Sequence, residues 1–285
     1  MSDIIIHKTP ASFLRAAPKT GAKIATMDIE NFPMLSYHWG MFKQFISPIQ
    51  VVEHTTLMSY CFKWLDSPHV FYDDNRGMGR KMRNDNRLLK GLHRILDGVD
   101  MHVAQNGERF DLPKIRARMA VEGYAPLKPT KVMDTLLQNK KHFGFASNSL
   151  DFMSNVLDLS NKKKKHGAFP GFELWLECLQ DNPDAWDECK DYNIRDVVAT
   201  EEMYLRLRGW YNGGHNVAVF NDYDPTEGEA EHHCDKCGSP DTVKDGKYRT
   251  KVGVYQAYRC NSCNGWSRGR VLLLDKRQRS HINMS

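Results

Sequence analysis

Runs of apolar residues rich in aromatic and β-branched side chains predict strands in the first half of the chain. They cover residues 23–29, 34–42, 54–64 and 99–106, and residues 130–136 indicate a strand that leads into a helix. Most of these runs have the length of strands rather than helices. They predict a sheet built mainly from the first half of the sequence.

Helical periodicity follows. Residues 86–96 place Leu and Ile side chains three and four positions apart, and Gly98 ends the segment. Further helices are expected at 111–123, 149–157, 172–180 and 183–208. Strands first, and then an alternation of strands and helices, predict an α/β layered architecture.

The segment 220–233 is acidic, contains Pro and Gly, and has no hydrophobic periodicity. It therefore indicates a linker. We expect a main domain over residues 1–219, a linker over 220–231, and a small unit with a basic tail over 232–285.

Composition narrows the class of protein. The 285 residues are 41% hydrophobic, enough for one sizeable core and a small appendage. No run of 18 apolar residues occurs, and the N-terminal apolar stretch is too short for a signal peptide. We expect a cytoplasmic protein of a bacterial or phage-infected cell, without a membrane partner.

The net charge of +5 is unevenly distributed. From His232 onward the chain holds 11 of its 40 Lys and Arg but 4 of its 35 Asp and Glu, so 29 basic and 31 acidic residues remain in the body. A slightly acidic body suits a cation site, and a basic tail suits a polyanion, although solubility alone could produce the same asymmetry.

Acidic residues occur at three separated places where a folded core could bring them together. Asp28 and Glu30 end a predicted strand and lie on the same face of it. Asp111 opens a predicted helix, and Tyr192 and Asp196 share one face of the last helix of the body. Like charges at such short spacing repel, so a positive group is expected between Asp28 and Glu30.

Two divalent cations would supply that positive charge. Hard cations prefer carboxylate oxygens, and a pair of them about 3.5–4 Å apart can cleave a phosphodiester bond. Asp134 is a possible fourth acidic position. Each motif alone is weak, because an acidic strand end is usually solvated and a Tyr and an Asp at this spacing are often a surface pair.

The segments "MDIEN", "NGERFD" and "YNIRD", in this order, resemble the three motifs of the DEDD family of 3′→5′ exonucleases. The resemblance covers about residues 20–210 and is closest to the proofreading domains of DNA polymerases. It implies a ribonuclease H-like mixed sheet flanked by helices, with two Mg²⁺ or Mn²⁺ ions. The ligands it implies are Asp28, Glu30, Asp111 and Asp196.

The same resemblance assigns the remaining roles. Tyr192 would orient the attacking water, which matches the tyrosine subclass because Asp191 stands where other members have His. Asn106 and Phe110 would contact a single-stranded 3′ end, and Phe32 is a further candidate that could instead fill the core. Two departures, Asn31 for Thr and Gln105 for His, affect substrate contacts more than catalysis.

Four cysteines form two C-x-x-C pairs separated by about 22 residues, a spacing that indicates one tetrahedral zinc ion in a zinc ribbon. They are Cys234, Cys237, Cys260 and Cys263. Between the pairs, Lys247, Arg249 and Arg259 alternate with tyrosines and predict a nucleic-acid surface. A protein-docking module is the alternative.

The sequence thus predicts a metal-dependent 3′→5′ exonuclease that acts on DNA, preferably single-stranded. An exoribonuclease is one alternative, because the chain does not reveal how it treats a 2′-hydroxyl. An inactive nucleic-acid-binding adaptor is another, disfavoured because all four acids are present. Proofreading would need a separate polymerase or repair protein as partner.

Overall fold

The structure is a computed structural model that describes residues 4–162, 167–221, 223, 232–251 and 253–282. It divides into two compact units. The first comprises Met1–Ala17 and Lys23–Met203, and the second comprises Pro18–Ala22 and Tyr204–Ser285. Most of the predicted linker, 220–231, lies outside the described residues, so the domain boundaries stay a prediction.

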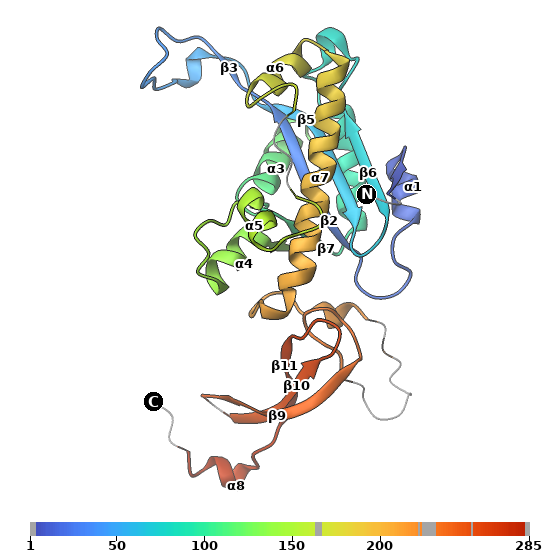
Figure 1. Ribbon diagram of the computed structural model, residues 1–285, viewed down its shortest axis with the longest axis vertical. Coiled ribbons are helices and arrows are strands. Elements are labelled where there is room, and N and C mark those ends of the chain that lie inside the picture. Colours follow the sequence, from blue (N-terminus) through green and yellow to red (C-terminus); the bar gives the residue numbers. More distant parts are fainter. Residues whose placement is uncertain (1–3, 163–166, 222, 224–231, 252, 283–285) are drawn as a thin grey trace. The chain divides into compact units, whose positions relative to one another are not determined.

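A six-stranded mixed sheet forms the centre of the first unit (Figure 1). The middle strand β5 runs antiparallel to both of its neighbours, whereas β1 is parallel to β6, and β2, β7 and β8 are parallel to one another. The strands, in spatial order, are β1 (Ile5–His7), β6 (His69–Asp74), β5 (Thr56–Trp64), β2 (Ile24–Phe32), β7 (Met101–Ala104) and β8 (Lys131–Asp134). The predicted mixed sheet flanked by helices is confirmed.

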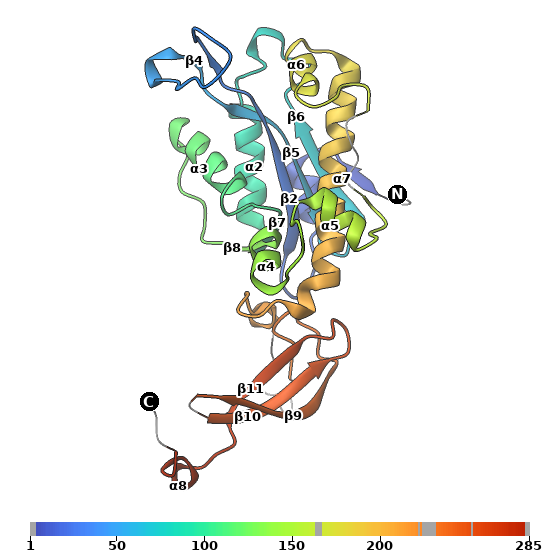
Figure 2. The ribbon, with the colours of Figure 1, turned by 60° about the vertical axis from the view of Figure 1, so that its left-hand side comes forward.

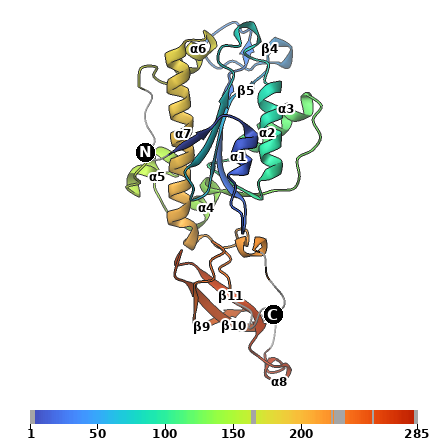
Figure 3. The same ribbon diagram turned by 90° about the vertical axis from the view of Figure 1, so that its right-hand side faces the viewer.

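Helices cover both faces of this sheet, and Figure 3 shows the sheet edge-on between them. On one face lie α1 (Pro10–Arg15), α2 (Asn86–Gly98) and α3 (Asp111–Val121). The long helix α7 (Pro183–Leu207) covers the other face. The remaining helices are α4 (Thr135–His142), α5 (Leu150–Val156) and α6 (Glu173–Leu179). Among the described residues, no helix is long and apolar enough to cross a membrane.

The core explains why β2 presents its acids to α7. Met27 and Ile29 are buried in the cluster formed with α2 and α3. Side chains alternate along a strand, so Asp28 and Glu30 point to the opposite face. Cys61, which pairs with Asp28 across the sheet, packs with Ile194 of α7. The expectation that the two acids share a face therefore holds.

The predicted strand at 34–42 is mostly wrong. Only Leu35–Ser36 is extended (β3), and it pairs with β4 (Val51–Glu53) in a separate two-stranded sheet. The apolar side chains of this segment are exposed, so no core holds them as a longer strand. The elements β1, α1 and β6 were not predicted, because they are short and interrupted by polar residues.

The second unit is a three-stranded antiparallel sheet in the order β11-β10-β9. Its strands are β9 (Thr242–Thr250), β10 (Gly253–Cys260) and β11 (Trp266–Leu272), and the short helix α8 (Lys276–Arg279) follows. Two 3₁₀ turns, Arg208–Trp210 and Val217–Phe220, also belong to it. β9 and β10 form the predicted hairpin.

Candidate active site and metal centre

A cavity of about 590 Å³ in the first unit brings together residues from all three sequence motifs. Asp28 and Glu30 of β2, Tyr192 and Asp196 of α7, and Phe110 before α3 contribute to its wall. The helical spacing of four residues aims Tyr192 and Asp196 at the same side, as expected. Figure 2 shows β2 and α7, which supply the carboxylates of the wall, beside one another.

Asp111 lies next to this wall but is buried. Its carboxylate Oδ1 accepts a hydrogen bond from the backbone N–H of Ile29 at 3.2 Å, and Ile29 stands between Asp28 and Glu30. Burial raises the pKa of Asp111 to about 7, and the nearby charge of Asp134 adds to the rise. A cation beside this carboxyl would favour its ionised form.

The cavity wall has an excess of negative charge. It carries three carboxylates against one ammonium group, that of Lys140. Among the described residues, these acids do not form a set of three whose ligand atoms all lie within 4.8 Å. The acids thus have the chemistry that hard divalent cations prefer.

Asp134 is not a member of the acidic cluster in the cavity wall. Its two carboxylate oxygens accept the backbone N–H groups of Asn106, Glu108 and Leu137, each at 3.1 Å. It therefore caps α4 and fixes the loop of the second motif, in which Asn106 adopts a left-handed φ of 67°. The carboxylate positions the loop that leads to Asp111.

Asn193 is a site residue that sequence reasoning missed. It is completely buried on α7, and its side-chain Nδ2–H donates a hydrogen bond to Oδ2 of Asp28. Its position directly after Tyr192 was the one hint in the sequence. A single Asn inside a helix has no pattern that marks it as part of a site. It fixes the Asp28 carboxylate from the opposite element.

Other parts of the wall come from Gln105 after β7, the polar residues 147–149 before α5, and Trp175 of α6. Gln105 is oriented by two contacts, since its Nε2–H donates to the carbonyl of Asn148 at 2.8 Å and its Oε1 accepts from the Thr135 hydroxyl at 2.5 Å. No short motif contains these residues together, so the sequence could not group them.

Of the predicted substrate contacts in the first unit, one lies at the cavity and two do not. Phe110 is partly exposed at the cavity, with the Lys114 ammonium 4.2 Å from the centre of its ring. Asn106 is not in the described wall. The prediction that Phe32 contacts substrate is wrong. Its ring is fully buried beneath α6 and α7 and packs edge-to-face on Trp186, with 6.0 Å between the ring centroids. It fills the core and does not line the cavity.

Comparison with protein families decides the classification of this unit. A model of the RNase H superfamily matches residues 51–208, more than half of the chain. The chain belongs to the RNase H superfamily. The matched segment includes Asp111, Tyr192 and Asp196, and it begins after the strand that carries Asp28 and Glu30.

Among solved structures, this RNase H superfamily protein is similar to the family B DNA polymerase from the hyperthermophilic archaeon Pyrobaculum calidifontis. The TM-score is 0.48 at 16% sequence identity, over 65% of this chain. The chain spans 24% of the length of that polymerase. No curated protein sequence matches the chain. Membership of the RNase H superfamily supports a nuclease-type function that uses divalent metals and binds nucleic acid.

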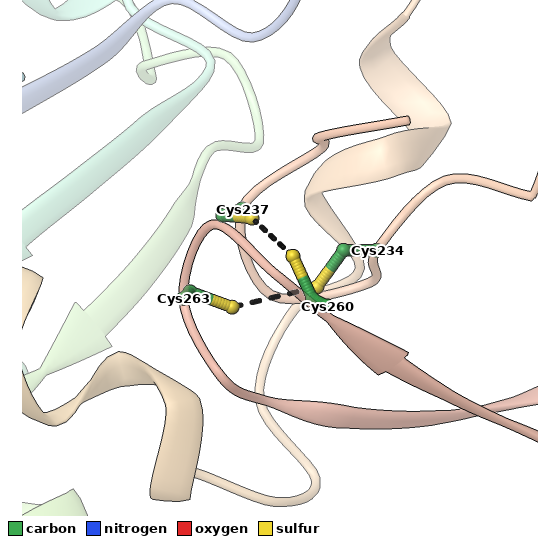
Figure 4. A group of neighbouring side chains, drawn as sticks. All are labelled: Cys234, Cys237, Cys260 and Cys263. Atoms are coloured by element: carbon green, nitrogen blue, oxygen red, sulfur yellow. Dashed lines mark hydrogen bonds between the residues drawn. The ribbon is translucent and has the colours of Figure 1, made fainter. Parts of the chain in front are cut away.

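The second unit of this RNase H superfamily member carries the four cysteines. Figure 4 shows their sulfur atoms directed toward one another, and all four lie within 4.8 Å. Two Sγ–Sγ distances, Cys234 to Cys263 and Cys237 to Cys260, are 3.6 Å. Tetrahedral zinc with Zn–S bonds of about 2.3 Å separates its sulfurs by about 3.8 Å, so the group could bind zinc. Hydrogen bonds from Cys234 and Cys237 lower the pKa of the Cys263 thiol to about 4.

The strand register divides the predicted basic residues between the two faces of this sheet. Lys247 and Arg249 lie on one face of β9. A register shift between β9 and β10 puts Arg259 of β10 on the opposite face, which it shares with Tyr248. Arg259 forms an ion pair with Asp245 at 3.6 Å. The three predicted cations therefore do not form one continuous surface.

Proposed function

We propose that this chain is a metal-dependent 3′→5′ exonuclease of the DEDD type, tyrosine subclass, which hydrolyses phosphodiester bonds at the 3′ end of DNA. The observation that supports this most is the single cavity lined by Asp28, Glu30, Tyr192 and Asp196. Single-stranded DNA is the preferred substrate, because the terminal bond must enter a cavity of about 590 Å³.

In this proposal Asp28, Glu30, Asp111 and Asp196 hold two Mg²⁺ or Mn²⁺ ions. When bound, such ions lower the pKa of water and neutralise charge on the leaving oxygen. Asp28 keeps its orientation through Asn193, and Asp111 through the Ile29 amide. The protein thus contributes fixed carboxylates whose mutual repulsion the cations relieve.

Tyr192 positions the attacking water by a hydrogen bond. An ordinary Tyr has a pKa of about 10 and is a poor base at neutral pH, so its hydroxyl orients rather than deprotonates. Phe110 is placed to stack against a base near the cleaved bond, because its ring is partly exposed at the cavity. We expect Tyr192→Phe to slow hydrolysis while metal affinity stays within about twofold of wild type.

We further propose that the cysteine cluster is a structural zinc site and that the second unit is a zinc ribbon. Lys247 and Arg249 share one face of its sheet, where cations can meet phosphates. Arg259 lies on the other face and is partly neutralised by Asp245, so Lys247 and Arg249 would contribute more.

The test of the nuclease is incubation of the full chain with 5′-labelled single-stranded DNA and RNA in Mg²⁺, in Mn²⁺ or without either. A ladder of shortened 5′-labelled products is expected, and an Asp28→Ala, Asp196→Ala variant should give none. Asp187→Ala is the matched control, because Asp187 is an exposed acid on the same helix that pairs with Arg76. Equal cleavage by the double variant would exclude this site, and the preferred substrate identifies DNA or RNA.

The test of the ribbon is the salt dependence of binding to single-stranded DNA. Lys247→Glu with Arg249→Glu should reduce the magnitude of the slope of log affinity against log salt by about 1.4, because each neutralised phosphate of a single strand adds about 0.7 to that slope. Lys90→Glu with Lys131→Glu, exposed cations of the first unit outside the cavity wall, is the control. A slope unchanged in the ribbon variant would rule out phosphate binding by this face.

A further inference from the structure

The segment between β2 and β5 is a surface that the nuclease chemistry does not use. Pro33–His54, called the apolar arm below, carries β3 and β4 and extends away from the central sheet (Figures 1 and 2). Trp39 is fully exposed, and Phe45 and Ile49 are 95% and 92% exposed. Tyr37, Met41 and Phe42 are also largely exposed. Such a concentration of exposed apolar side chains marks an interaction surface.

The apolar arm is an organised element. Arg83 joins its two ends, because Nη2–H groups donate to the carbonyls of Pro33 at 2.6 Å and His54 at 3.1 Å. Arg83 also pairs with Glu53. Further out, Tyr37 and Gln50 are bonded to each other through two contacts of 2.9 Å. The backbone is therefore fixed by polar contacts while the apolar side chains point outward.

The charge of the apolar arm argues against nucleic acid as its binding partner. Within Pro33–His54 the charged residues are Lys43 and Glu53, and Glu53 is paired with Arg83. Lys and Arg contacts to phosphates supply most of the affinity of proteins for nucleic acid. One lysine among 22 residues cannot provide them, so a protein surface is the better match.

The same lack of charge suits a second copy of this chain. In a two-fold contact a charge near the axis meets its own copy, and like charges repel, so a nearly uncharged surface favours this kind of pairing. Its four exposed aromatic side chains offer about 150–250 Å² each, roughly 600–1,000 Å² per copy, to which Met41 and Ile49 add. A stable interface needs about 800 Å² per partner, which the apolar arm can supply.

We propose that the apolar arm is a self-association surface through which two copies of this chain pair about a two-fold axis. Trp39, Phe42 and Phe45 form the centre of the contact, because aromatic side chains dominate the energy of protein interfaces. This pairing is independent of the nuclease chemistry, and either can fail without the other.

The test is sedimentation velocity of the full chain from about 1 to 100 µM, with zinc present. The expected result is a shift from 32.9 kDa to twice that mass with rising concentration. A Trp39→Ser, Phe42→Ser, Phe45→Ser variant should raise the dissociation constant ~30-fold or more, as removal of a hot spot does. Because these side chains are exposed, its melting temperature at low concentration should match wild type.

A Val121→Ser, Phe172→Ser variant is the control, since both side chains are exposed outside the apolar arm and it should associate like wild type. Wild type that remains monomeric at 100 µM would overturn the proposal, as would a triple variant that associates normally. A triple variant that loses affinity for single-stranded DNA with no change in mass would also overturn it, and would identify nucleic acid as the occupant.

Discussion

Replacing Asn193 by Ala removes the donor that fixes the Asp28 carboxylate. Asn193 is fully buried, and its Nδ2–H donates to Oδ2 of Asp28 across the space between α7 and β2. Ala removes that hydrogen bond and so weakens the hold on the orientation of the carboxylate. If Asp28 holds a cation, the change should weaken cation binding without altering any ligand.

The size of the effect follows from the type of bond. A hydrogen bond to a charged acceptor contributes about 1.5–3 kcal/mol, which corresponds to roughly 10- to 150-fold in affinity. Removing a group that orients a metal ligand typically costs about 10- to 100-fold in metal affinity or activity. We therefore expect Mn²⁺ affinity and single-turnover cleavage to fall together by about 10- to 100-fold.

Isothermal titration of Mn²⁺ measures the first quantity, and cleavage of 5′-labelled DNA at saturating Mn²⁺ measures the second. Asn155→Ala is the matched control, because the Asn155 side chain on α5 bonds to Asp151 one turn earlier on the same helix. Asn193→Asp should be at least as damaging as Ala, since it faces Asp28 with a like charge. Mn²⁺ affinity of Asn193→Ala within twofold of wild type would refute the reasoning, even if the variant melts earlier.

Three further predictions concern pH, zinc and stability. Burial raises the pKa of Asp111 to about 7, so the folded protein favours the protonated form of this carboxyl. Without Mg²⁺ or Mn²⁺, its contribution to stability is therefore complete below about pH 4 and is lost as the pH rises toward 7. Asp111→Asn should flatten the dependence of the urea midpoint on pH between pH 4 and 8, and an unchanged profile would contradict this. Cys260→Ser should reduce the zinc content from one ion per chain to none, as measured by elemental analysis; retained zinc would argue against a four-cysteine site. Lys63→Met should cost about 3–5 kcal/mol in urea unfolding because it strands the buried Glu201 carboxylate, and a Glu201→Leu partner mutation should recover part of that stability.

Much of the candidate active site could be predicted from the sequence, because the spacings that indicate it span only a few residues. The D-x-E spacing of β2 and the i, i+4 spacing of α7 fix which side chains share a face, whatever the rest of the chain does. Once α7 packs on the face of the sheet to which Asp28 and Glu30 point, Asp28, Glu30, Tyr192 and Asp196 meet in one cavity. The cysteine pairs are equally local, and the hairpin between them closes the cluster.

Contacts between distant segments were beyond such reasoning. Asp134 looked like one more acid, yet its oxygens are committed to three backbone N–H groups. Phe32 looked available beside the first motif, yet the packing of α6 and α7 buries it. Both outcomes depend on partners that no spacing along the chain reveals.

The sequence by itself determined the α/β class, the candidate acids and the four cysteines, because periodicity and ligand spacing act over a few residues. The tertiary structure alone decided that Asn193 holds Asp28, that Arg259 lies on the opposite face of the ribbon sheet from Lys247 and Arg249, and that residues 34–42 stand outside the core. Those features depend on which surfaces meet when the chain folds. A hydrophobic segment indicates that its side chains are to be buried, but it does not specify what buries them. In the apolar arm, no part of the described chain covers them.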